Sequence, residues 1–173
     1  MSDGIDSGQA KGTVYDFVKD RRLAVIATAS NTGAPEAALI NIAVTPDLEI
    51  VFETTSATRK YVNLMRNPRV CLVIGWQDDR TLQLDGLVDG PEGRDYERLK
   101  AFYISAFPQK TSHEYWPGND YYRVRPRWAR LSNYNSPRKI EEFSFPLDES
   151  LYPLKRSWWA RLRRPRRVSP QRN

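Results

Sequence analysis

Short runs of alternating apolar and polar residues recur along this chain, and they predict a protein built mainly from β-strands. The clearest run lies between Leu48 and Val73, where a β-branched and aromatic segment at 49–53 predicts a strand. Apolar residues at helical spacing follow it, and they predict a short helix that carries Tyr61, Leu64 and Met65. We expect the hydroxyl residues at 54–56 to cap this helix and Asn67-Pro68 to end it, because proline cannot continue the hydrogen-bond ladder.

The rest of the chain shows the same organisation. The pattern predicts strands at 23–28, 36–44, 49–53, 69–76, 80–88, 121–131 and 138–145. It predicts further helices from Thr13, where a capping box with Asp16 would start the helix, and over 92–106, and it leaves 107–120 as a loop. Gly86 inside a strand predicts a bulge or a close approach of backbones. Hairpin-length turns join most strands, which favours an antiparallel barrel or strongly coiled sheet with peripheral helices.

Composition divides the 173-residue chain into three parts. Residues 1–11 are small and polar and predict a disordered N-terminus, residues 12–150 predict one folded domain, and residues 151–173 form a basic tail. Eight of the 27 basic residues follow Glu149 with no acidic residue among them, so the remainder holds 19 basic and 21 acidic residues. The net charge of +6 therefore belongs to the tail and argues against a basic nucleic-acid-binding face on the domain.

Few residues offer catalytic or metal-binding chemistry. One histidine and one cysteine give no zinc spacing and no catalytic triad, and neither common nucleotide-binding glycine motif occurs. We expect His113 to be a solvated loop residue and Cys71 to be a small apolar residue of a strand. The N-terminus contains no signal-peptide core, so a cytoplasmic location is expected. Such a chain either binds a ligand or takes its chemistry from a cofactor.

The one anion-binding feature is the first turn of the short helix predicted after the strand at 49–53. Arg59 and Lys60 fall in its first turn, where free backbone N–H groups already favour negative charge. Two cations beside several hydroxyl groups suit a phosphate. The alternative is that both side chains are simply solvated.

These residues also resemble a known family. Thr58-Arg59-Lys60 followed by Asn67-Pro68-Arg69-Val70, together with Ala27-Thr28, Gly33-Ala34-Pro35, Trp76, Gly86 and 121–126, is similar to the FMN-binding split barrels related to pyridoxamine 5'-phosphate oxidase. The resemblance covers roughly residues 12–145, and 54–70 is its most specific part. It implies a six- to seven-stranded antiparallel split β-barrel with peripheral helices. It also implies FMN as the cofactor and a homodimer with flavin sites between the subunits.

The resemblance assigns roles to individual residues. Thr58, Arg59 and Lys60 would hold the FMN phosphate, the backbone of Glu53 and Thr54 would lie along the flavin, and Ile40 and Asn41 would support the isoalloxazine edge. A polar side chain on the 80–88 strand would also reach the cofactor, and the candidates are Thr81 and Gln83. For Trp128 two positions stay open, the flavin cleft and the core.

Two departures argue against pyridoxamine phosphate oxidase activity itself. Family oxidases carry an arginine where this chain has Ala38, and they carry a C-terminal Arg-x-His element, whereas no histidine follows His113. We therefore expect a flavin-dependent oxidoreductase acting on another small molecule, with no side chain assigned as acid or base. The alternatives are a deazaflavin-dependent reductase and a non-enzymatic flavin carrier or sensor. The tail could contact a membrane or nucleic acid, but a solvated tail is the favoured interpretation.

Overall fold

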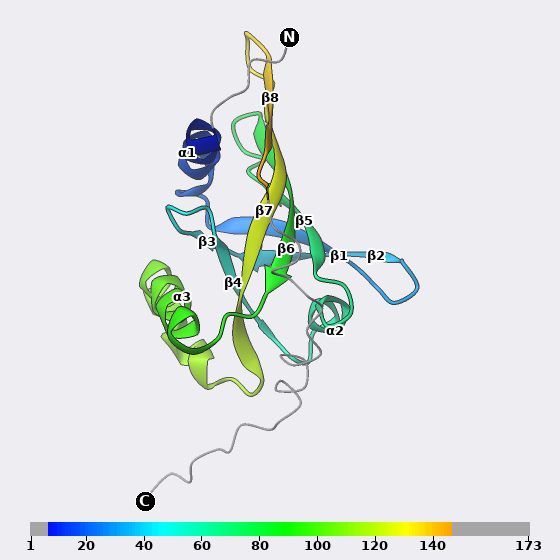
Figure 1. Cartoon of the computed structure of the whole chain (residues 1–173), viewed down its shortest axis with the longest axis vertical. Coiled ribbons are helices and arrows are strands. Elements are labelled where there is room, and N and C mark those ends of the chain that lie inside the picture. The colour runs from blue at the N-terminus through cyan, green and yellow to red at the C-terminus, as the bar shows by residue number, and fades with distance from the viewer. Residues whose placement is uncertain (1–6, 147–173) are drawn as a thin grey trace, which may run out of the picture.

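The computed structural model describes residues 7–146, and within them eight strands form one antiparallel sheet (Figure 1). The hydrogen-bonded order is β2-β1-β5-β6-β7-β4-β3, and β8 pairs with residues 128–133 of β7. The bounds of the elements are α1 Ser7–Val18, β1 Leu23–Ala29, β2 Pro35–Asn41, β3 Ala43–Val44, β4 Ile50–Thr55, α2 Arg59–Leu64, β5 Arg69–Ile74, β6 Arg80–Asp89, α3 Gly93–Ala106, the 3₁₀ helix η1 Pro108–Tyr115, β7 Asn119–Asn133 and β8 Lys139–Ser144.

The sheet curls back on itself between β2 and β3. These two strands lie at opposite ends of the hydrogen-bonded order, yet Ile42 alone separates them in the sequence. The strand predicted over 36–44 is therefore two strands, because Ile42 is fully buried and its N–H donates to Arg22 O, outside either ladder. The result is the predicted antiparallel split barrel, with eight strands rather than six or seven.

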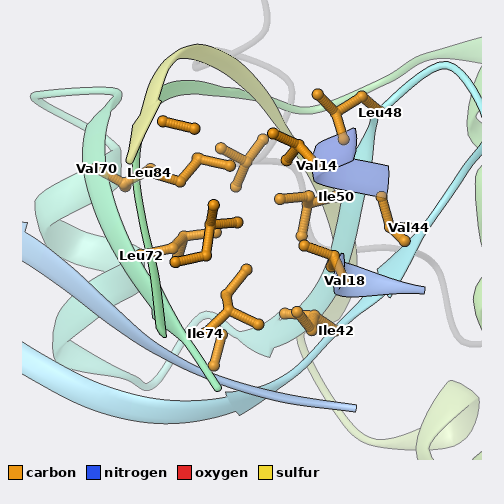
Figure 2. Close-up of a cluster of buried hydrophobic side chains, with 14 of the residues drawn as sticks. Val14, Val18, Ile42, Val44, Leu48, Ile50, Val70, Leu72, Ile74 and Leu84 are labelled. Carbon is orange, nitrogen blue, oxygen red and sulfur yellow. The ribbon is translucent and has the colours of Figure 1, made fainter. Parts of the chain in front are cut away.

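Alternate side chains of the strands fill the interior of this barrel. Figure 2 shows side chains of β5, β6 and the β3–β4 segment pointing toward one another, with α1 closing one side. Leu72, Ile74 and Leu84 are fully buried there, because alternate side chains of a strand point to the same face of the sheet. A second apolar cluster lies between α3 and the sheet, where Leu99 and Tyr103 of α3 cover Val51 and Tyr121.

Three local predictions are corrected. The first helix begins at Ser7 rather than Thr13, because Ala10 extends the buried stripe of Val14 and Phe17 by one turn, and Thr13 Oγ1 bonds Gln9 O inside the helix. Residues 7–11 are therefore helical rather than disordered. Part of the loop predicted at 107–120 is the helix η1. The prediction for Gly86 is confirmed, because the β6–β7 register shifts between Asp85 and Gly86 and a Cβ at Gly86 would lie 2.7 Å from Arg125 O.

Two predictions about the ends of the chain lie partly or wholly outside the described residues. The basic tail at 151–173 and the last four residues of the domain predicted at 12–150 are not among them, so both stay predictions. Within residues 7–146, no helix is long and apolar enough to cross a membrane.

A buried arginine joins α3 to three strands. Arg123 of β7 is 5% exposed, and its guanidinium bonds Glu49 Oε1 at 2.6 Å, both carboxylate oxygens of Asp89 at 2.9 and 3.0 Å, and Asp95 Oδ2 at 2.8 Å. Arg98 of α3 binds Glu49 and Asp95 from the solvent side. No local pattern indicates this cluster, because Arg123 lies 74, 34 and 28 positions from Glu49, Asp89 and Asp95.

Because of this cluster, we expect the free energy of unfolding to fall at acidic pH. Burial alone would raise the pKa of Glu49 and Asp95, but hydrogen bonds from Arg98 and Arg123 outweigh it and lower the pKa of both carboxyls. Their stabilising contribution is present above the unfolded-state pKa of about 4, and it is lost as the pH falls through the lower folded-state value. Urea unfolding at pH 7, 4 and 3 should show this loss, with a shallower decline for Asp95→Asn. Equal stability at pH 7 and pH 3 would contradict it.

Candidate functional site

Threonine hydroxyls organise the turn between β4 and α2. Thr58 is the N-cap of α2, and its Oγ1 accepts the N–H of Tyr61 at 3.3 Å. Its hydroxyl also donates to Thr55 O at 3.0 Å and lies 2.9 Å from the Thr54 hydroxyl. Residues 54–56 were predicted to cap the helix, and this prediction is wrong by two positions. The helix begins at Arg59, because Thr58 has the extended backbone and the side-chain hydrogen bond of an N-cap, and Arg59 and Lys60 lie in its first turn as predicted.

The two cations of this turn have different surroundings. The Lys60 side chain is half-buried, and burial lowers the pKa of its ammonium group. Within residues 7–146, the Lys60 ammonium group takes part in no side-chain hydrogen bond or ion pair. Arg59 is 83% exposed and forms an ion pair with Glu36 of β2. A half-buried ammonium without a carboxylate partner is the stronger attraction for an added anion.

Glu36 is the residue of this site that the sequence did not reveal. Its other carboxylate oxygen accepts the side-chain N–H of Asn63 at 2.9 Å, and the same amide donates to Thr28 Oγ1 at 3.0 Å. Asn63 and Thr28 are each 5% exposed, so the amide is held between β1, β2 and α2. No local pattern could have shown this, because the contact joins residues 27 positions apart.

The other predicted flavin contacts lie apart from this turn. Ile40 is 4% exposed and packs into the barrel core, and Asn41 is half-buried at the end of β2 opposite Leu23. Thr81 and Gln83 lie on β6, two strands from β1 in the sheet. The helix α2 packs on β1 and β2 (Figure 1). The fold therefore brings Thr54, Thr58, Arg59 and Lys60 together, but leaves Thr81 and Gln83 elsewhere on the sheet.

Trp128 lines a pocket rather than the core. It pairs with Asp85 across β6 and β7, is half-buried and belongs to neither apolar cluster. Asp85, Arg127, Phe145 and Pro146 complete the lining of this open pocket of about 350 Å³. Of the two positions left open for Trp128, the core is therefore excluded.

A second polar site surrounds the side chain of Glu53. Its carboxylate accepts His113 Nδ1 at 2.9 Å and the Asn119 amide at 3.1 Å, and the imidazole stacks on Trp116 at 3.8 Å between ring centres. The prediction that His113 is solvated is wrong, because η1 folds over the end of β4 and brings the ring to Glu53. Among the described residues, His113 Nε2 has no hydrogen-bond partner. No group of three or more His, Cys, Asp or Glu within residues 7–146 could hold a metal ion.

Comparison with known proteins gives a family and a fold. The family model described as pyridoxamine 5'-phosphate oxidase matches residues 10–133. A pyridoxine/pyridoxamine 5'-phosphate oxidase from Salinibacter ruber is 28% identical over 132 residues, which cover 75% of this chain and 51% of the relative. This chain thus spans about half the length of that relative.

Solved structures show the same fold at low identity. A heme binding protein from Mycobacterium smegmatis superposes with a TM-score of 0.67 at 16% identity, over 81% of this chain and 58% of the other. The heme storage protein HutZ from Vibrio cholerae superposes with a TM-score of 0.60 at 14% identity, over 77% and 92%. At these identities the likeness concerns the fold alone.

Proposed function

This chain belongs to the pyridoxamine 5'-phosphate oxidase family, and from that premise we propose that it binds FMN and acts as a flavin-dependent oxidoreductase. The observation that carries the proposal is Lys60, a half-buried cation without a carboxylate partner among the described residues, in the first turn of the helix that Thr58 caps. A phosphate monoester suits such a cation, because its oxygens accept hydrogen bonds from an ammonium group.

The residues fit FMN in a defined arrangement. Thr58, Arg59 and Lys60 would bind the phosphate, while the β4 backbone at 53–54 and the end of β2 at 40–41 would border the flavin ring. Thr81, Gln83 and Trp128 lie on β6 and β7, away from the β1–β2 face on which α2 packs. In the proposed homodimer, with flavin sites between the subunits, these residues would come from the second copy.

The substrate is proposed to be a small molecule other than pyridoxamine phosphate. Ala38 cannot supply the guanidinium that family oxidases have at this position, and no histidine follows His113 to complete the substrate element. Bound flavin would supply hydride or electron exchange at N5. This chain would hold the phosphate, orient the ring and exclude water.

The spectrum and mass of the purified protein test this proposal. We expect the yellow absorbance of oxidised flavin after FMN is added and excess is removed, a dimer by light scattering, and reduction of the bound flavin by NADH or NADPH. Binding of a deazaflavin in preference to FMN would favour the alternative, a deazaflavin-dependent reductase. Flavin binding without reduction by any donor would favour a carrier or sensor, and no flavin binding would overturn the proposal.

Haem is the second candidate, and His113 is the observation that favours it. Because the Glu53 carboxylate holds Nδ1, the Nε2 atom of His113 stays available, and His113 would bind the haem iron through that nitrogen. Two solved structures of this fold are named as heme-binding or heme-storage proteins. In the same spectral experiment, hemin added instead of FMN should give a sharp Soret band that is lost in His113→Ala if this candidate holds.

A further inference from the structure

The carboxylate of Glu36 binds two side-chain donors of α2, those of Arg59 and Asn63. Glu36 lies in β2 opposite Thr28 of β1, and its side chain is only 18% exposed. One of its oxygens binds the Arg59 guanidinium, and the other accepts from the Asn63 amide at 2.9 Å. Each carboxylate oxygen is thus bound by a separate side chain of the same short helix.

These donors match a phosphate as well as a carboxylate. Guanidinium and amide N–H groups bind the oxygens of either anion with similar geometry. Asn63 is buried, and its amide would lose a hydrogen bond if Glu36 left without a replacement. Arg59 has no such constraint, because it is 83% exposed and water can solvate it.

Glu36 weakens the attraction of this turn for an added anion. Arg59 and Lys60 would together present two positive charges, and Glu36 removes one of them. A phosphate that approaches Arg59 must displace Glu36 from the guanidinium or accept the repulsion of a nearby carboxylate. Unphosphorylated flavin would meet neither obstacle.

We propose that Glu36 is a specificity-determining residue that competes with the FMN phosphate for Arg59 and so narrows the preference for FMN over riboflavin. The inference rests on the proposed FMN site. The opposite possibility is that Glu36 orients Arg59 toward the phosphate, in which case its removal would weaken FMN binding. The two roles differ in sign and can therefore be separated by one substitution.

The experiment compares the full chain with its Glu36→Gln variant, using FMN and riboflavin as ligands and quenching of flavin fluorescence as the signal. Glutamine keeps an oxygen for Asn63 but removes the charge. We expect FMN to bind about three- to tenfold more tightly, in keeping with the loss of a largely exposed ion pair, and riboflavin to be unchanged. Glu97→Gln, an exposed carboxylate on α3, removes the same charge elsewhere and should change neither affinity.

Two further variants keep the result decisive. In an Arg59→Ala background, Glu36→Gln should no longer tighten FMN, because the contested guanidinium is gone. Glu36→Asp shortens the side chain and should also tighten FMN, which serves if the glutamine variant does not fold. Unchanged or weaker FMN binding by Glu36→Gln, in a wild-type protein that does bind FMN, would overturn this inference alone. Failure of the wild type to bind FMN would overturn the proposed function together with it.

Discussion

Replacing Arg123 with methionine should lower the free energy of unfolding by about 3 kcal/mol, which is the low end of the range for removing one partner of a buried ion pair. Arg123 is 5% exposed and bonds Glu49, Asp89 and Asp95, so the variant leaves three carboxylates without their shared cation. Arg98 and Arg125 remain beside these carboxylates and keep the loss from being larger. The midpoint of urea unfolding at pH 7 measures the change.

Arg94→Met is the matched control for this substitution. Arg94 lies on α3, is exposed and forms no ion pair among the described residues, so its loss should change stability by less than about 0.5 kcal/mol. At pH 3 the difference between Arg123→Met and the wild type should shrink, because protonated carboxyls no longer need the guanidinium. Equal stability of the wild type and Arg123→Met at pH 7 would show that the cluster contributes no net free energy.

The strands could be predicted because the alternation of apolar and polar residues within each strand follows from its own buried and exposed faces. In β6 the alternation of Leu82 and Leu84 with Thr81 and Gln83 follows directly from one face against the core and one toward solvent. Gly86 could be predicted as a bulge for the same local reason, since an interior strand glycine usually marks a close backbone approach.

The features that the sequence did not reveal depend on contacts between distant segments. The break at Ile42 follows from closure of the sheet, which no single strand specifies. The sequence places His113 in a surface loop, whereas in the structure η1 brings its ring to Glu53, 60 positions away. The start of α1 was missed because Ala10 is too small to stand out as part of the apolar stripe, although it is 3% exposed.

In the candidate site, too, the residues close together in the sequence could be predicted and the distant one could not. Thr54, Thr58, Arg59 and Lys60 lie within seven consecutive residues, so their short separation along the chain was enough to predict that they lie together. Glu36 reaches Arg59 only through the pairing of β1 with β2 and the packing of α2 on both. The sequence therefore predicted the cations of the site but not the carboxylate that shares it.

Removing both cations should abolish most FMN binding. Arg59→Ala with Lys60→Ala deletes up to two charge-assisted hydrogen bonds to the phosphate, each contributing about 1.5–3 kcal/mol, so affinity should fall about a hundredfold or more. Glu36 would then face the phosphate without its guanidinium partner, which adds repulsion. Riboflavin affinity should stay within about threefold of wild type, because riboflavin has no phosphate. Titration of both flavins by fluorescence quenching gives the two numbers.

The single variants and a charge-matched control assign this loss to the phosphate site. Lys60→Ala alone should have the larger effect, because Lys60 is half-buried and has no carboxylate partner among the described residues, whereas Arg59 is exposed and already paired. Arg66→Ala with Arg94→Ala removes the same net charge from exposed positions and should leave FMN affinity nearly unchanged. If the Arg59 and Lys60 double variant purifies with full flavin content, the phosphate does not lie at this turn. A loss shared equally by FMN and riboflavin would instead mean that the turn supports the flavin ring.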